Sequence, residues 1–185
     1  DLDGDGYADL PLLAAADGSA WVLAGRADNR WNPLNGRSAP DQAELELSPA
    51  LTRGSLVVVI EGDLDGDGLD DLLIGEPDLR DEDGGAGALH LVYGAPDLLS
   101  GSATRPLPEG ADAILLGVED GHHLGRAVTA ADLDNDGYAE LLVGAPGVEG
   151  GAVYLLPGGV VRQGGSASVD GRAFAWHTSS GVAAA

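Results

Sequence analysis

Short apolar segments of about five to eight residues recur along the chain, separated by turns rich in glycine, aspartate and proline. Thirty glycines and ten prolines in 185 residues interrupt the chain too often for long helices. Segments of this length that lie between turn residues are typical of β-strands. The pattern therefore predicts an all-β fold.

The expected strands fall into three groups. The third group has four, at 126–131, 141–143, 152–156 and 174–177. The second group also has four, at 56–60, 72–74, 89–93 and 113–116. The first group has three, at 10–13, 20–23 and 43–47, because no strand precedes Asp1 in the way that strands precede the equivalent points of the other groups. We expect the first group to lack its opening strand.

Two unrelated motifs recur three times in the same order. The first is an acidic segment of the type Asp-Leu-Asp-Gly-Asp-Gly, which occupies residues 1–9, 63–71 and 132–140. The second is a glycine-bounded apolar segment, which occupies residues 18–25, 87–94 and 151–158. Chance would not preserve both motifs in order, so the chain is built from repeats.

Four-stranded antiparallel units of this length fit the blades of a β-propeller, which has about four to eight blades in a ring. A solenoid fits less well, because its repeats are usually shorter and carry fewer elements. We expect blades at residues 1–54, 55–123 and 124–185, together forming one partial propeller domain. Three blades cannot close a ring, and open end faces would expose apolar surface. The rest of a ring, or a partner, is expected to cover the end blades.

The acidic segments have the composition of calcium-binding loops. Carboxylates stand at positions 1, 3, 5 and 9, position 6 is glycine, and position 7 offers its backbone carbonyl. Calcium takes six to eight oxygen ligands, and glycine permits the positive-φ backbone that wraps the ion. The sequence predicts up to three Ca²⁺ ions, with these ligands: Asp1, Asp3, Asp5, Tyr7 and Asp9; Asp63, Asp65, Asp67, Leu69 and Asp71; Asp132, Asp134, Asp136, Tyr138 and Glu140.

A solvated acidic turn without an ion is the alternative reading. Two carboxylates about 4 Å apart repel by about 1 kcal/mol in water and about 4 kcal/mol at an effective dielectric constant near 20. Four converging groups make six such pairs, so a cation is the favoured reading. The loops are not EF-hands, because position 12 is Leu12, Ile74 or Val143 instead of a bidentate glutamate. A strand follows each loop, so the ion would chiefly stabilise a hairpin.

The third unit resembles the FG-GAP repeat of the integrin α-subunit N-terminal β-propeller and its bacterial relatives. The resemblance rests on Leu124-Gly125 and on the run Asp132-Leu-Asp-Asn-Asp-Gly-Tyr-Ala-Glu-Leu-Leu-Val-Gly-Ala-Pro146. The second unit has Ser55-Leu56 and Gly75-Glu-Pro77 at the corresponding places, and the first has Leu13-Ala-Ala15. The resemblance implies a propeller, commonly seven-bladed, with calcium loops on one face.

The same resemblance implies that ligands bind on the opposite face. The loops that would form this face are 77–85, 117–125 and 147–150, and the candidate ligand-binding residues are Arg80, Asp81, Glu82, Asp83, His122 and His123. The two adjacent histidines also fit an ordinary polar loop. Trp31, Tyr93 and Trp176 could contact a ligand, although packing between blades is the favoured use of these aromatic side chains.

Composition excludes several functions. The formal charge is −22, and the nine basic residues are all arginines scattered singly, so a cationic surface for nucleic acid is absent. No run approaches the ~18 apolar residues of a membrane span. Without cysteine there are no disulfides or thiolate metal sites.

The leading functional hypothesis is a non-enzymatic, calcium-binding module for adhesion, or for recognition of a protein or glycan ligand. Extracellular modules bind calcium at about 10⁻⁴–10⁻³ M, which favours a location outside the cell, at its surface or in a periplasm. The alternative is a propeller or accessory domain of a secreted hydrolase or lyase, although no activated nucleophile or Gly-x-Ser-x-Gly motif is present. A purely structural spacer is a third possibility.

Overall fold

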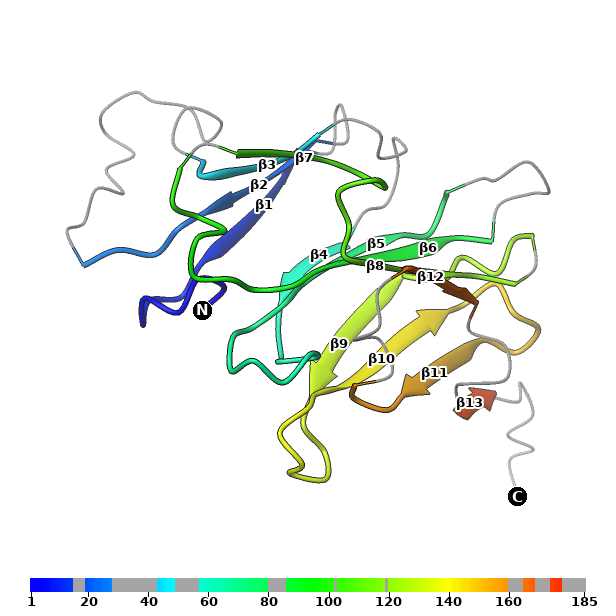
Figure 1. Cartoon of the computed structure of the whole chain (residues 1–185). Coiled ribbons are helices and arrows are strands. Elements are labelled where there is room, and N and C mark those ends of the chain that lie inside the picture. Colours follow the sequence, from blue (N-terminus) through cyan, green and yellow to red (C-terminus); the bar gives the residue numbers. More distant parts are fainter. Residues whose placement is uncertain are drawn as a thin grey trace, which may run out of the picture.

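The computed structural model describes residues 1–14, 19–27, 43–48, 57–79, 86–101, 103–118, 120–159, 165–168 and 174–177. Within these ranges the chain forms strands, turns and bends and no helix. Thirteen strands are arranged in three sheets that lie one after another (Figure 1). The all-β propeller-like architecture expected from the repeat is confirmed.

Each sheet is built mainly from one repeat. Blade one contains β1 (Leu10–Ala14), β2 (Ser19–Leu23) and β3 (Leu45–Ser48). Blade two contains β4 (Val57–Ile60), β5 (Leu72–Glu76), β6 (Ala88–Val92) and β8 (Ala113–Leu116). Blade three contains β9 (Ala127–Ala131), β10 (Glu140–Ala145), β11 (Ala152–Leu156) and β13 (Phe174–His177). Within each blade, neighbouring strands are antiparallel.

Two further strands cross between blades. β7 (Ala103–Pro106) leaves blade two and pairs in parallel with β3, the outer strand of blade one. β12 (Gly165–Ser168) leaves the third repeat and pairs in parallel with β8, the outer strand of blade two. The sheet orders are therefore β1-β2-β3-β7, β12-β8-β6-β5-β4 and β13-β11-β10-β9.

These crossing strands were not predicted. The sequence of β7 is Ala-Thr-Arg-Pro and that of β12 is Gly-Ser-Ala-Ser, so neither shows apolar alternation. An outermost strand such as β7, which is largely exposed, can be held by main-chain bonds alone; for example, the Ala103 N–H donates to the Glu44 carbonyl at 2.8 Å. The strand added by the following unit is therefore the fourth strand of the first sheet and the fifth strand of the second.

Two apolar cores lie between the blades. Leu72, Ile74 and Val92 of blade two pack in the core shared with blade one, together with Val22, Leu45 and Leu47. Leu73, Leu89 and Leu91 of the same blade pack in the core shared with blade three, together with Leu141, Val143 and Ala152. Strands covered on both faces read as continuous apolar runs, which explains the composition of β5.

The acidic loops all lie at one end of the sheets (Figure 1). The second and third loops join β4 to β5 and β9 to β10, so each closes an antiparallel hairpin as predicted. The β10–β11 turn and the β8–β9 connection lie at the opposite end (Figure 1). Over the part of the chain that the structure describes, there is no helix long and apolar enough to cross a membrane.

Candidate metal and ligand-binding sites

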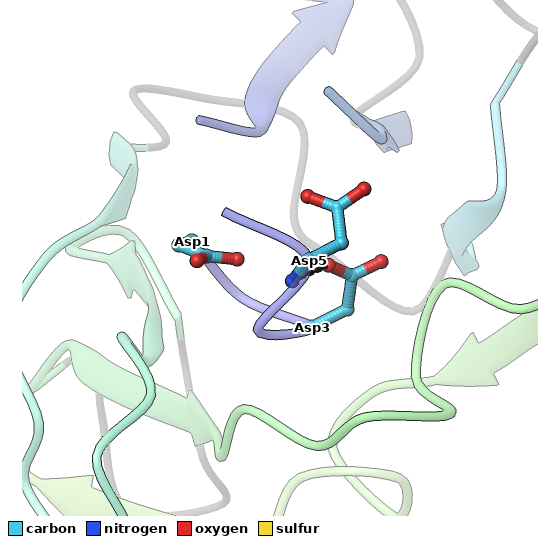
Figure 2. Close-up of side chains that lie close together, drawn as sticks. All are labelled: Asp1, Asp3 and Asp5. Atoms are coloured by element: carbon cyan, nitrogen blue, oxygen red, sulfur yellow. Dashed lines mark hydrogen bonds between the residues drawn. The ribbon is translucent and has the colours of Figure 1, made fainter. Parts of the chain in front are cut away.

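The first acidic loop gathers three carboxylates around a tight turn (Figure 2). One ligand oxygen each from Asp1, Asp3 and Asp5 lie within 4.8 Å of one another. The loop is held by its own backbone: the Asp5 N–H donates to Asp3 Oδ1 at 3.1 Å, and the Gly6 N–H donates to Asp1 Oδ2 at 3.0 Å. Gly4 and Gly6 adopt φ of 74° and 87°, the left-handed backbone that turns the carboxylates inward.

The other two loops also gather three carboxylates each. In the third loop these are positions 1, 3 and 5 again, Asp132, Asp134 and Asp136, whereas in the second loop position 9 joins positions 1 and 3, so that the group is Asp63, Asp65 and Asp71. The bond from position 6 to position 1 recurs: the Gly68 N–H donates to Asp63 at 2.7 Å, and the Gly137 N–H donates to Asp132 at 3.1 Å. The structure thus brings together nine of the predicted ligands, three in each loop.

The carboxylate at position 9 joins each loop to the segment that follows β2, β6 or β11 of its own blade, at the same end of the sheet. Asp71 accepts the Leu64 N–H at 2.7 Å and the Gly94 N–H at 2.9 Å. Asp9 accepts from Leu2 at 2.7 Å and from Gly25 at 2.8 Å, and Glu140 accepts from Leu133 at 2.8 Å and from Gly158 at 3.1 Å. The longer glutamate makes the same pair of bonds as aspartate. Position 9 is therefore a positioning residue, and its contact with a metal stays a prediction for Asp9, Asp71 and Glu140.

The second loop has the strongest electrostatic strain. Burial, together with repulsion from Asp65 and Asp63, raises the pKa of Asp71 to about 7, against the lowering effect of its two backbone bonds. Burial also raises the pKa of Tyr93 to about 12, with the negative charges of Asp71, Asp65 and Asp112 contributing. A cation in this loop would relieve the repulsion that both shifts record.

The donor set fits a hard divalent cation. The nine grouped side chains all offer carboxylate oxygens, which are among the oxygen ligands that Ca²⁺ takes. Asp1 Oδ1 is buried and has no hydrogen-bond partner. A buried, unsatisfied carboxylate oxygen that lies in a group of three is what a coordinated ion would complete. The carbonyls of Tyr7, Leu69 and Tyr138, and the carboxylate of Asp67, stay predicted ligands.

A shallow cavity lies at the opposite end of the sheets, between blades two and three. It has a volume of about 350 Å³ and is lined by Asp78, His123, Arg126, Pro146 and Gly147. Three connections build it: the segment after β5, the β8–β9 connection and the β10–β11 turn.

His123 is fixed at the edge of this cavity. Its backbone is left-handed, with φ of 56°, and its Nδ1 lies 3.1 Å from the Pro77 carbonyl and 3.3 Å from Asp78 Oδ1. The Gly147 N–H donates to the His122 carbonyl at 3.0 Å, which joins two of the connections. Arg126 is exposed and forms no ion pair with any residue that the structure describes. Among the residues that the structure describes, the cavity thus offers one unpaired cation, Arg126, beside a histidine.

The start of the third repeat docks onto blade two through Leu124 and Gly125. Leu124 is fully buried, and its N–H donates to the Ala86 carbonyl at 3.1 Å. Gly125 has φ of 88° and lies directly against Gly75, so neither position has room for a Cβ. In the third unit, therefore, a large apolar residue and a glycine come first. An acidic loop follows them, and a strand that contains glycine comes last.

The family model described as FG-GAP repeat matches residues 62–92 and 124–156. The chain carries FG-GAP repeats. Integrin alpha-PS2 of Drosophila melanogaster is 35% identical over 170 residues, which cover 85% of this chain and 11% of that protein. Integrin alpha-5 of Xenopus laevis is 37% identical over 107 residues, which cover 53% of this chain and 10% of that protein. The chain thus spans about a tenth of the length of these relatives.

Only two of the six residues predicted to bind a ligand lie in the described part of the chain. His122 and His123 lie at the end expected for them, whereas Arg80, Asp81, Glu82 and Asp83 fall outside the described residues. Tyr93 packs against the core between blades two and three, which favours the packing role for this ring. Trp31 and the side chain of Trp176 also fall outside the description.

Sequence reasoning missed the role of the glycine that follows β2, β6 and β11 in the three units. Gly25, Gly94 and Gly158 each donate a backbone N–H to position 9 of the acidic loop. A Cβ at Gly94 would lie 2.5 Å from the Asp70 carbonyl oxygen, so the close approach requires glycine. The signal was present, because these glycines close the second repeated motif.

Proposed function

We propose that this chain is a calcium-stabilised part of an extracellular recognition propeller. In this proposal, each acidic loop binds one Ca²⁺, and the end of the sheets opposite the loops binds a protein or glycan ligand. The observation that carries the proposal is the recurrence of three carboxylate groups, each held in a fixed turn by backbone hydrogen bonds. Integrin alpha chains among the relatives support a role in adhesion or ligand recognition.

The metal would act chiefly on stability. A site with a dissociation constant of about 10⁻⁴–10⁻³ M is largely filled at the millimolar calcium found outside cells. At ~2 mM Ca²⁺ such a site adds about 0.6–1.8 kcal/mol to the free energy of unfolding. Up to three sites, in a larger ring, would then stabilise the blades whose opposite ends carry the ligand surface.

The cavity formed by Asp78, His123, Arg126, Pro146 and Gly147 is the proposed centre of the ligand surface. It lies where loops from two blades meet, and Arg126 offers a cation that no described residue neutralises. A chain with a net charge of −22 repels acidic molecules overall, so an unpaired arginine beside a fixed histidine gives local selectivity.

Calorimetric titration with Ca²⁺ tests the first half of this proposal. We expect up to three bound ions, and one fewer in the Asp134→Ala variant. Asp134 lies in the exposed third loop, where the substitution removes a ligand without emptying a core. Failure of the folded protein to bind calcium at millimolar concentration would contradict the metal sites.

Labelled protein on arrays of extracellular proteins and glycans tests the second half. Retention should occur in ~2 mM Ca²⁺, a concentration at or above the expected dissociation constant, and should fall for His123→Ala and Arg126→Glu. The matched control is Glu109→Gln, which changes an exposed charge outside the cavity. Calcium binding without any retained ligand, or turnover of a polysaccharide by the chain itself, would overturn the recognition role and leave the metal sites standing.

A further inference from the structure

A histidine and a glutamate form a buried polar pair inside blade two. His90 of β6 and Glu76, the last residue of β5, are 1% and 2% exposed, and Nε2 of the histidine lies 2.9 Å from Oε2 of the glutamate. The other ring nitrogen of His90, Nδ1, is buried and has no hydrogen-bond partner within the residues that the structure describes. A buried pair that leaves one atom unsatisfied is weak evidence for stability, because apolar residues of similar size often serve as well or better. The pair therefore needs another explanation.

The third unit has different residues at the same two places. Ala145 stands where Glu76 stands, and Tyr154 stands where His90 stands, because β10 and β11 repeat the register of β5 and β6. Both members of the pair thus depart together from the pattern of the third unit. Each change alone would bury a polar side chain without its partner, which costs free energy. The two residues are therefore best understood as one device.

The connection that follows Glu76 is longer than its counterpart in blade three. Residues 77–87 join β5 to β6, whereas residues 146–151 join β10 to β11. Closing a longer connection costs more conformational entropy, so the strand ends that it joins are held together less firmly. The bond between His90 and Glu76 crosses from one strand to the other at this end. It adds a directional tie where the longer connection begins.

Glu76 also begins a turn. The Leu79 N–H donates to the Glu76 carbonyl at 3.1 Å, and Pro77 stands at the second position of this turn, where its fixed φ is favoured. In blade three the Val148 N–H donates to the Ala145 carbonyl at 3.4 Å, so the equivalent turn forms there without a buried carboxylate. The turn of blade two therefore starts from the residue that is tied to β6.

This turn holds His123 at the edge of the cavity. Nδ1 of His123 lies 3.1 Å from the Pro77 carbonyl and 3.3 Å from Asp78 Oδ1. A carbonyl oxygen can only accept, so Nδ1 carries a hydrogen and donates it. In the neutral ring Nε2 is then an acceptor, and no residue that the structure describes pairs with it. The cavity lining thus combines an acceptor on His123 with the donor groups of Arg126.

We propose that His90 and Glu76 are positioning residues for the ligand cavity. Their bond pins the end of β5, and the turn that starts there keeps the hydrogen of His123 on Nδ1. The cavity then fits a ligand that donates a hydroxyl or N–H to His123 Nε2 and offers an acceptor, such as a carboxylate, to Arg126. This description of the ligand rests on the proposed recognition role, whereas the effect on His123 does not.

Nuclear magnetic resonance of the isotope-labelled full chain, in calcium buffer, tests the pair without any ligand. In the unsubstituted chain the spectra should place the hydrogen of the neutral His123 ring on Nδ1. Glu76→Ala and His90→Tyr, which copy the third unit, should each let this hydrogen spread over both ring nitrogens. They should also quicken hydrogen exchange at the Leu79 N–H severalfold, while the Val148 N–H keeps its rate as the internal control.

Two further variants separate positioning from general packing. Glu76→Gln keeps an oxygen acceptor for His90 Nε2, so the hydrogen of His123 should stay on Nδ1. Val92→Ala truncates a buried side chain of the same strand, nearer to the acidic loops. It should lower the melting temperature and leave His123 unchanged.

Melting curves measured on the same samples show whether each variant is folded. If a single substitution prevents folding, the double variant with both Glu76→Ala and His90→Tyr is measured in its place, because it leaves no lone buried polar group. Folded variants of this kind in which the hydrogen of His123 stays on Nδ1 would overturn the proposal. An equal change at His123 in Val92→Ala would also contradict it, because the effect would then come from packing.

A ligand retained on the arrays gives a second measurement. Its retention should fall for Glu76→Ala and persist for Glu76→Gln, with the number of bound Ca²⁺ ions unchanged in both. Equal retention by these two variants would overturn the positioning role in recognition. If the unsubstituted chain retains no ligand, the recognition role fails, and the resonance measurement still decides whether the pair holds His123.

Discussion

The carboxylate of Asp71 accepts the backbone N–H of Gly94 at 2.9 Å, although the two residues are 23 positions apart in the chain. This bond joins the second acidic loop to the end of β6. Because the same carboxylate also accepts the Leu64 N–H, one buried side chain satisfies two buried donors. The loop is therefore shaped by the blade as well as by its own turn.

Asp71→Ala should lower the free energy of unfolding by about 2–5 kcal/mol, because it leaves two buried N–H groups without a partner. Chemical denaturation should show this loss both with calcium and in chelator. Asp65→Ala, by contrast, should cost more stability in calcium than in chelator, because without the ion it loses mainly the exposed bond from the Asp67 N–H to Asp65 Oδ1. An Asp71→Ala effect that disappears in chelator would mean that the backbone bonds contribute little.

In calcium-stripped buffer, the free energy of unfolding should fall as pH rises from about 4 to about 7. The pKa of Asp71 is raised to about 7 in the folded protein from an ordinary value of 3.8, so between these values the folded state binds the proton and the unfolded state releases it. Stability is then present below the unfolded pKa and is lost as pH rises through the folded pKa.

Denaturation curves across this pH range measure the effect, with Asp71→Asn as the control. The asparagine variant should be less stable overall, because its amide group faces backbone donors, but its dependence on pH should be flatter. Saturating calcium should reverse the trend near neutral pH, since the ion binds the ionised carboxylates. Identical pH profiles for the two proteins would rule out Asp71 as the titrating group.

Leu107→Ala should destabilise the protein by about 2–5 kcal/mol, the usual cost of truncating a buried leucine. Leu107 is 0% exposed. It follows β7 directly and packs in the core between blades one and two. Hydrogen exchange should quicken in β3 as well as in β7. Val118→Ala, at a side chain that is 45% exposed, should change stability by less than about 0.5 kcal/mol.

Gly66→Ala should cost more than Gly68→Ala. Both glycines have left-handed backbones, with φ of 80° and 92°, so each substitution carries a backbone penalty of about 1–2 kcal/mol. Only at Gly66 does a new Cβ also meet Tyr138, whereas the space around Gly68 is open. Thermal denaturation of Gly66→Ala with Tyr138→Ala should recover the difference, and equal effects of the two single substitutions would argue against the contact.

The sequence predicted the regular parts of the fold because they rest on local signals. β8, β11 and β13 begin and end where the apolar runs do, and the acidic loops follow from their own spacing. The three carboxylate groups were likewise visible, since each comes from one short segment. Position 9 was predicted as a ligand, and the structure adds that it anchors the loop to a strand end far along the chain.

What the sequence did not reveal depends on contacts between units. β7 and β12 have polar or small residues and gain their strand conformation from an edge supplied by another blade. His90 and Glu76 form a buried pair, with Nε2 and Oε2 2.9 Å apart. The pattern of apolar residues in the sequence does not predict this pair. The blade boundaries at 54–55 and 123–124 stay predictions. A single boundary in the sequence does not separate two sheets completely, because β7 and β12 each pair with the sheet of the preceding unit.

β7 belongs to the second repeat in sequence but pairs with the sheet of the first. This arrangement has a consequence for how such proteins can evolve. Deleting one repeat would remove the outer strand from the sheet of the repeat before it. The crossing strand of the repeat after it would then have to pair with a different sheet. A repeat can then be gained or lost only if its crossing strand fits the sheets of its neighbours, so a change in the number of repeats requires a change in that strand.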